Sequence, residues 1–189
     1  MESHFQLVLI LQLLFFIGGD CAVFTLKNNC NVTIWPGSLS GAGHPLLING
    51  GLELQPYETT EINFTLDSPM DFYDVSFVDG FNIPISVYPS GGTGNCSNIQ
   101  CSSDINLQCP QELQVKTYDG TTVACKSACF VFNKPEYCCT GEFNNPSTCK
   151  PTEYSQYFKN GCSDAYSYAY DDATSIFTCK GANYLITFC

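Results

Sequence analysis

The sequence predicts a mainly β protein, in which a β-sandwich or barrel joins a disulfide-rich region that holds two short helices. Three observations support this prediction. Two stretches within residues 22–88 alternate apolar and polar side chains, no strongly periodic helix occurs in residues 22–88, and residues 89–179 hold ten of the cysteines. A chain of 189 residues is long enough to fold as one domain with an apolar core.

The β-rich part is predicted from three stretches and the C-terminal residues. The stretch AVFTLKNNCNVTIWPG alternates and ends at a Pro-Gly turn, and GLELQPYETTEINFTL alternates again. The third stretch, DFYDVSFVDGFNIPISVY, is aromatic and β-branched, and an Asp-Gly turn at residues 79–80 interrupts it. The last stretch, NYLITFC, is expected to rejoin the sheet.

The disulfide-rich part, residues 89–179, contains two predicted helices. The first, CKSACFVF at residues 125–132, places two cysteines one helical turn apart. The second, PTEYSQYFKNG at residues 151–161, has Pro151 in its first turn, aromatic side chains at helical spacing and Gly161 as its end. We interpret these aromatic side chains as packing residues.

The N-terminal segment is typical of a secretory signal peptide. Residues 7–19, LVLILQLLFFIGG, are nearly all apolar but short for a membrane span. We expect residues 1–21 to be removed near Cys21–Ala22, so that residues 22–189 form a secreted domain without a membrane span. The first residues, MESH, lack the usual positive charge, so a retained anchor and a bacterial lipoprotein are alternatives, although Asp20 fits a lipidation site poorly.

The cysteine count favours an oxidising compartment. Removing Cys21 with the leader leaves twelve of the 13 cysteines, and an even number predicts six disulfides. A zinc site is the alternative. However, His44 is the only histidine after the leader, it lies far from the cysteine-rich part, and no CxxC pair occurs. We therefore expect neither a metal nor another cofactor.

The chain is acidic throughout. Its formal net charge is −11, and losing Glu2 and Asp20 with the leader changes this to −9. All seven basic residues are lysines. This balance argues against nucleic acid and anionic membrane surfaces as partners.

Several of these stretches resemble the thaumatin-like family of plant defence proteins. They are AVFTLKNNCNVTIWPG, DFYDVSFVDGFNIP, CPQELQV, PEYCCTGEFNNPSTCKPTEYSQYFKNGCSDAYSYAYDD, IFTCKG and NYLITFC. The adjacent cysteines Cys138 and Cys139, followed by PTEYSQYFK, are a specific signature, and the resemblance covers nearly the whole mature chain. It implies a monomer with a flattened β-sandwich, a disulfide-rich region with short helices, and secretion to the apoplast.

The resemblance also implies one disulfide pattern among the roughly ten thousand that twelve cysteines allow. The implied pairs are Cys30–Cys189, Cys96–Cys179, Cys101–Cys162, Cys109–Cys125, Cys129–Cys138 and Cys139–Cys149.

The chain departs from the family pattern at one place. Members of the family usually carry sixteen cysteines, and the four that are missing here belong to a block rich in Gly, Arg and Cys. That block would lie between GGLELQPYET and EINFTL, and here the two ends meet around Thr59-Thr60. We therefore interpret the chain as internally truncated, either as a real isoform or through a faulty gene model.

Similar proteins line an acidic cleft with one Arg, one Glu and three Asp, and this cleft binds β-1,3-glucan or, in some members, hydrolyses it. The resemblance assigns Asp74 and Asp79 to two of the Asp positions and Asp164 to the third, with Asp171 as a rival. Two carboxylates without a nearby cation are expected to raise each other's pKa. The alternative interpretation is that Asp79 only supports its turn and that Asp74 accepts backbone hydrogen bonds.

The catalytic set expected for a glycosidase is incomplete. The family Glu position is held by Asn63, with Glu61 two residues earlier, and the chain has no arginine. Glu61 and Asp79 are therefore only candidate catalytic residues, since hydrolysis needs two carboxyl groups at a fixed separation. Asn31 and Asn63 are candidate glycosylation sites, and Asn95 is a weaker one because Cys96 follows it.

From these features the leading hypothesis is a secreted, antifungal, pathogenesis-related protein that binds fungal cell-wall polysaccharide without competent catalysis. A weak endo-β-1,3-glucanase is the second hypothesis. The third is an inhibitor whose partner is a microbial wall-degrading enzyme.

Overall fold

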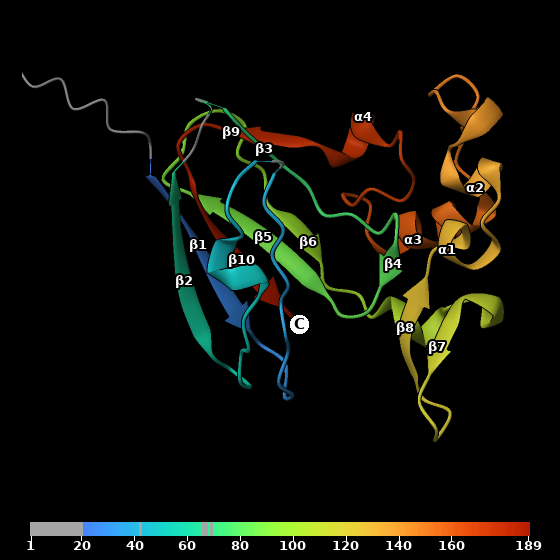
Figure 1. Ribbon diagram of the computed structural model, residues 1–189, viewed down its shortest axis with the longest axis horizontal. Coiled ribbons are helices and arrows are strands. Elements are labelled where there is room, and N and C mark those ends of the chain that lie inside the picture. Colours follow the sequence, from blue (N-terminus) through green and yellow to red (C-terminus); the bar gives the residue numbers. More distant parts are fainter. Residues whose placement is uncertain (1–20, 42, 66–67, 69) are drawn as a thin grey trace, which may run out of the picture.

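A computed structural model describes residues 21–41, 43–65, 68 and 70–189, so residues 1–20 of the predicted leader lie outside the described part. The main feature is a five-stranded sheet with the strand order β2-β1-β10-β5-β6 (Figure 1). Its strands are β1 (Cys21–Asn28), β2 (Thr59–Thr65), β5 (Ile85–Ser90), β6 (Ile99–Cys101) and β10 (Asn183–Phe188).

The C-terminal strand β10 joins this sheet, as predicted, and lies in its middle. It pairs in parallel with β1 and antiparallel with β5, and Phe24 lies opposite Tyr184. Strand β2 pairs antiparallel with the other side of β1 over seven residues. The two ends of the chain's β-rich part therefore form one sheet.

Smaller sheets and short helices complete the fold. One sheet pairs β3 with β9, and another has the order β4-β8-β7. These strands are β3 (Asp71–Tyr73), β4 (Gly80–Phe81), β7 (Gln114–Lys116), β8 (Thr122–Lys126) and β9 (Phe177–Cys179). The α-helices are α1 (Ala128–Phe132), α2 (Pro135–Cys138), α3 (Glu153–Gly161) and α4 (Asp172–Ser175). The 3₁₀ turns are η1 (Leu47–Gly50), η2 (Ile105–Gln108), η3 (Gln111–Leu113) and η4 (Gly141–Phe143).

Helix α3 is close to its prediction because its ends are locally encoded. The Thr152 side chain accepts a hydrogen bond from the Ser155 amide, and the Ser155 hydroxyl accepts one from the Thr152 amide, which forms a capping box. Phe158 packs into the core with only 1% of its surface exposed. The helix ends at Gly161, where a Cβ atom would lie 2.7 Å from the Ile105 side chain.

The helix predicted at residues 125–132 starts later than expected. Cys125 belongs to β8, where it pairs with Phe81 and Gln114. Ser127 then caps α1, because its side chain accepts a hydrogen bond from the Phe130 amide. The non-local strand pairing therefore overrides the helical pattern of this stretch.

Six disulfides are formed, and their pairs are those that the resemblance implies: Cys30–Cys189, Cys96–Cys179, Cys101–Cys162, Cys109–Cys125, Cys129–Cys138 and Cys139–Cys149. The first three join distant segments, and the last three close short loops. The mainly β architecture and the disulfide-rich region with short helices are both confirmed. Within the described part, no helix is long and apolar enough to cross a membrane.

The five-stranded sheet has one apolar face that its neighbours cover only in part. Ile34 and Leu54 cover one end of it, where they pack with Leu26 and lie beside Phe188. At another place Tyr73 of β3 packs against Tyr184, with ring centroids 5.2 Å apart. The apolar face remains open between these contacts.

Candidate functional site

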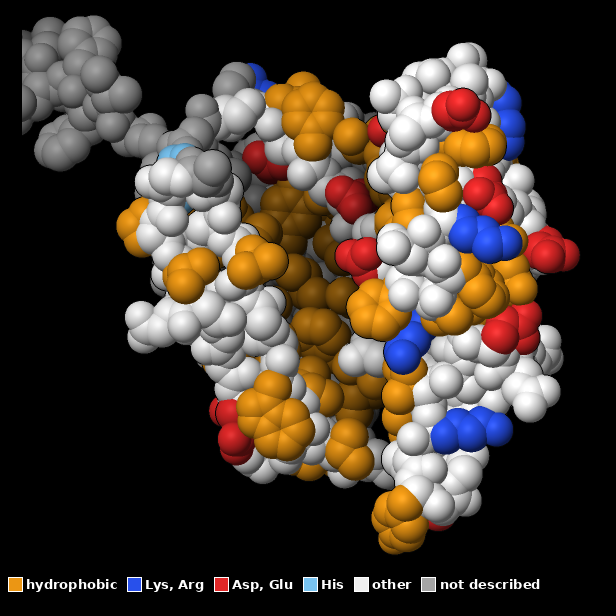
Figure 2. Space-filling view, turned by 45° about the vertical axis from the view of Figure 1, so that its right-hand side comes forward, with side chains coloured by type: hydrophobic (Ala, Val, Ile, Leu, Met, Phe, Trp, Pro, Cys, Tyr) orange, Lys and Arg blue, Asp and Glu red, His pale blue; other side chains and the backbone are white. Residues whose placement is uncertain are grey.

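The open part of the apolar sheet face forms a hollow with a cavity volume of about 770 Å³. This volume lies within the range of small-molecule and cofactor sites. Figure 2 shows the hollow as a deep, mainly hydrophobic surface with acidic side chains on its rim. The residues that line it are Phe24, Leu39, Phe64, Ser68, Met70, Asp71, Phe72, Tyr73, Asp74, Val87, Tyr184 and Ile186.

Strand register explains why aromatic side chains gather in the hollow. Ala22 lies opposite Phe64, and Phe24 lies opposite both Ile62 on β2 and Tyr184 on β10, so these side chains share one face. The Phe24 ring lies 4.0 Å from that of Phe64 and 5.7 Å from that of Tyr184, measured between centroids. The hollow therefore has a floor of ring faces and edges.

Asp71 is a buried carboxylate in the wall of the hollow, and it is not among the residues that the sequence predicts for a site. The Tyr184 hydroxyl donates a 2.8 Å hydrogen bond to its Oδ2 atom. Its Oδ1 atom is buried and has no hydrogen-bond partner among the described residues. Burial, followed by the hydrogen bond to Asp71, raises the pKa of Tyr184, so this hydroxyl stays protonated at neutral pH.

Asp74 lies at the border of the hollow, directly after strand β3, in which Asp71 is the first residue. It is exposed to solvent, and it lines both the hollow and the cavity that adjoins it. Partial burial raises the pKa of the Asp74 carboxyl above its usual value. The pKa of Asp74 is therefore raised, as expected, but the cause is desolvation of this carboxyl rather than repulsion from Asp79.

Asp79 sits at the predicted turn. The Gly80 amide donates a 3.0 Å hydrogen bond to the Phe77 carbonyl, and the Ser127 amide donates one of 3.3 Å to the Asp79 carbonyl. Gly80 adopts φ +120°, and a Cβ atom there would lie 2.4 Å from the Cys125 carbonyl oxygen. The Asp79 side chain is exposed and does not line the hollow. The interpretation that Asp79 supports the turn stays a prediction.

Asp164 comes alongside the same chain segment. Residues 75–77 and 165–166 run side by side in parallel, because the Tyr166 amide donates to the Val75 carbonyl and the Phe77 amide donates to the Tyr166 carbonyl, each at 2.8 Å. Asp164 is half-buried and accepts a hydrogen bond from the Ser163 hydroxyl at 3.3 Å. Asp164 does not line the hollow, and its role in a cleft stays a prediction.

Its rival, Asp171, has a structural role. The Lys159 ammonium lies 3.0 Å from its Oδ2 atom, and the Ser167 amide and hydroxyl donate to the same atom. Thr174 donates to the other oxygen at 3.2 Å. Asp171 is thus neutralised and hydrogen-bonded within its own loop.

Glu61 and Asn63 lie on the opposite face of the sheet from the hollow. Glu61 pairs with Thr25 and Asn63 with Val23, whereas the residues between them face the aromatic floor. The structure therefore does not bring Glu61 to Asp74 or into the hollow. Asn63 is exposed, as a glycosylation acceptor must be, and so is Asn31. No group of three or more metal-ligating side chains occurs in the described residues.

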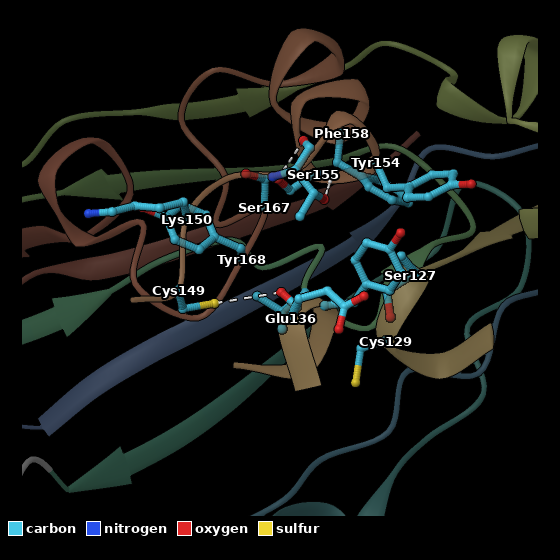
Figure 3. Close-up of a pocket in the computed structure, with 14 residues that line it drawn as sticks. Ser127, Cys129, Glu136, Cys149, Lys150, Tyr154, Ser155, Phe158, Ser167 and Tyr168 are labelled. Carbon is cyan, nitrogen blue, oxygen red and sulfur yellow. Dashed lines mark hydrogen bonds between the residues drawn. The ribbon is translucent and has the colours of Figure 1, made fainter. Parts of the chain in front are cut away.

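A second cavity, shown in Figure 3, is too small for a substrate. It lies between α1, α2 and α3, and Ser155, Ser167 and Tyr168 are among the residues that line it. Its volume is about 20 Å³, which is room for about one water molecule. We interpret this cavity as a packing feature of the disulfide-rich part.

Comparisons with known proteins agree with this fold. Residues 59–189 match the model of the Thaumatin family. The chain is 42% identical to "Pathogenesis-related thaumatin-like protein 3.5" of Cryptomeria japonica, with 90% of this chain and 92% of that protein covered. It is also 42% identical to "Thaumatin-like protein 1" of Castanea sativa, with 96% of each covered. It is 40% identical to "Glucan endo-1,3-beta-glucosidase" of Prunus avium, with 97% of this chain and 96% of that protein covered. The chain therefore belongs to the thaumatin family.

Proposed function

We propose that this protein is a secreted plant defence protein that binds fungal β-1,3-glucan in the hollow without hydrolysing it efficiently. The observation that carries the proposal is the placement of Asp74, beside Asp71, at an aromatic-lined hollow. Aromatic rings can pack against the C–H faces of sugar rings, and carboxylates accept hydrogen bonds from sugar hydroxyls. Membership of a family with pathogenesis-related relatives supports the defence role.

Weak catalysis follows from the positions of the carboxyl groups. Glycoside hydrolysis needs an acid and a second carboxylate on either side of the scissile bond, about 5 to 9.5 Å apart. The raised pKa of Asp74 suits a general acid. However, Asp71 is engaged by Tyr184, and Glu61 lies on the other sheet face. A weak endo-β-1,3-glucanase is the second candidate, favoured by the name of the Prunus avium relative.

Secretion is part of the proposal because the disulfides need an oxidising compartment. Six disulfides in a chain of 189 residues are typical of secreted proteins and rare in the cytosol. The apolar N-terminal segment, residues 7–19, supports the same interpretation. We therefore place the mature protein in the apoplast.

An internal truncation near Thr59 is also proposed, and it would explain the open hollow. The alignment with the Castanea sativa relative runs over 233 positions, whereas this chain has 189 residues, so at least 44 positions (233 − 189) have no counterpart here. The match to the family model begins at Thr59. A missing block between Tyr57 and Glu61 would leave the sheet face without part of its second layer.

Binding to insoluble β-1,3-glucan tests the proposal. We expect the purified mature chain to co-sediment with the glucan and to release little or no reducing sugar. Asp74→Asn should weaken co-sedimentation on the order of tenfold, because one charge-assisted hydrogen bond contributes about 1.5–3 kcal/mol. Glu142→Gln removes an exposed carboxylate elsewhere and serves as the matched control.

The alternatives give different results in the same assay. Reducing-sugar release that is lost in Asp74→Asn would favour the glucanase, because Asp74 is the carboxyl at the hollow that is suited to act as the acid. Absence of co-sedimentation, together with inhibition of a microbial glycanase by the intact chain, would favour the inhibitor. Either result would overturn the proposed function.

A further inference from the structure

The hollow is one end of a longer groove. It shares Asp74, Val87 and Ile186 with an adjoining cavity of about 300 Å³, which is not the small cavity of Figure 3. That cavity shares Asn82, Ile83 and Phe188 with a third cavity of about 500 Å³, which Trp35 lines. Figure 2 shows the hydrophobic floor extending along the face of the molecule.

Trp35 is held in place at the far end of this groove. Its side chain is 69% exposed, which is unusual for the largest apolar side chain. Its indole Nε1 donates a 3.1 Å hydrogen bond to Glu53 Oε2, and Gln55 donates to the other oxygen of Glu53. The Thr33 hydroxyl in turn donates to Gln55 Oε1 at 3.2 Å. This chain of hydrogen bonds fixes the ring while leaving it open to solvent.

The backbone explains why these polar and aromatic side chains share one side. Ile34 and Leu54 form an antiparallel bridge and are buried, at 8% and 0% exposure. Their neighbours in sequence therefore point outward from the two paired segments. A ring that is ordered before binding loses little conformational freedom when a ligand packs on it.

The groove suits an uncharged, extended polymer with both apolar and hydroxyl-bearing faces. None of the described residues that line the three cavities is a lysine. The carboxylates among them are Asp71 and Asp74, in and beside the hollow, and Glu53 lies next to Trp35 at the other end. A sugar ring stacked on the indole would also have Glu53 near the ring edge as a hydrogen-bond acceptor.

We infer that Trp35 is a distal subsite, which binds a sugar unit of a β-glucan chain whose other end occupies the hollow at Asp74. This inference rests on the proposed function and adds a chain-length preference to it. Short oligosaccharides fill only the hollow, and longer ones also reach Trp35. The protein therefore selects for polymer over disaccharide.

The test uses the intrinsic fluorescence of Trp35, which is the only tryptophan in the chain. The mature, disulfide-intact protein is titrated with β-1,3-gluco-oligosaccharides, from the disaccharide upward, and binding is measured in parallel by calorimetry. We expect the short oligosaccharides to bind without changing the emission. Above a threshold length, the emission should shift and the affinity should rise on the order of tenfold.

Three variants make the result specific. Trp35→Ala should lose the rise in affinity with length but keep the affinity for short oligosaccharides. Trp35→Phe should restore part of the rise, because it keeps a ring but loses the bond to Glu53. Asp74→Asn should weaken oligosaccharides of every length. Tyr118→Ala, which removes a fully exposed aromatic side chain outside the groove, is the matched control and should change nothing.

The failure of this inference and the failure of the proposed function are distinguishable. If glucan binds but the emission and the affinity do not change with length, only the Trp35 subsite is wrong. If the disaccharide already shifts the emission, Trp35 is a primary site rather than a distal one, and the inference is also wrong. If no oligosaccharide or polymer binds, the proposed function and its extension are both overturned.

Discussion

Removing the disulfide between Cys30 and Cys189 should destabilise the protein more than removing a local disulfide. This bond joins residues 159 apart, but Cys96–Cys179 already closes 83 of these positions, so the effective loop is 76 residues (159 − 83). The loop-entropy relation gives about 4.5 kcal/mol for a loop of this length at room temperature. The bond also pins the end of β10, which supplies Tyr184 to the hollow.

The comparison is the bond between Cys139 and Cys149, which spans only 10 residues. The same relation gives about 2.7 kcal/mol for this loop. Each pair is replaced by serine in a separate double variant, and the five remaining disulfides are verified by mass spectrometry. Urea unfolding then measures the free energy of unfolding of each variant. We expect the loss to be larger by about 1.8 kcal/mol for the long-range pair. Equal losses, or a larger loss for the local pair, would refute the loop-entropy reasoning.

Two further predictions concern the turn and the hollow. Gly80→Ala should lower the free energy of unfolding by about 3 kcal/mol or more in a urea titration. The reason is that the new Cβ atom would lie 2.4 Å from the Cys125 carbonyl oxygen, at a residue with a φ of +120°. A loss below about 1 kcal/mol, the cost of an ordinary substitution, would contradict this prediction. Asp74→Asn should slightly raise the free energy of unfolding at neutral pH. Burial raises the pKa of the Asp74 carboxyl, so the folded state binds a proton there more readily than the unfolded state does. Above the raised pKa, ionisation of this carboxyl therefore lowers the free energy of unfolding. The gain in the free energy of unfolding should vanish as pH falls below the ordinary aspartate pKa. A gain that grows at low pH would contradict this prediction.

Much of the fold could be predicted from the sequence because alternation and capping are local signals. The stretches around β1 and β2 alternate, the stretch that contains β5 is rich in aromatic and β-branched residues, and the ends of α3 are encoded by Thr152, Ser155 and Gly161. The start of α1 was wrong by three residues, because Cys125 is recruited into β8 by partners far away in sequence. The disulfide pairs came from the family resemblance, since counting alone leaves roughly ten thousand patterns.

The candidate site was predictable only in part. The family resemblance assigned Asp74, which lines the hollow, but Asp71 and Tyr184 are 113 residues apart and meet only through the order of the strands. The alternation of β2 already implied that Glu61 and Asn63 share a face, yet it could not tell which face meets the hollow. Nor could the sequence signal that Trp35 is exposed, because a tryptophan in an alternating stretch is ordinarily a core residue.

The hollow links ligand binding to stability. The apolar surface that would hold a ligand is left in water here, whereas a fully covered sandwich would bury it. Phe24, Phe64 and Ile186 stay partly exposed there, at a cost of about 25 cal/mol for each Å² of apolar surface left in water. Exposed apolar surface also favours aggregation, which the net charge of −9 expected for the mature chain opposes through repulsion. The disulfides restrict the unfolded chain without covering this surface. A polar substitution on the floor of the hollow should therefore gain solubility and lose affinity together. A change at Glu61, on the opposite face, alters the charge and leaves the floor intact.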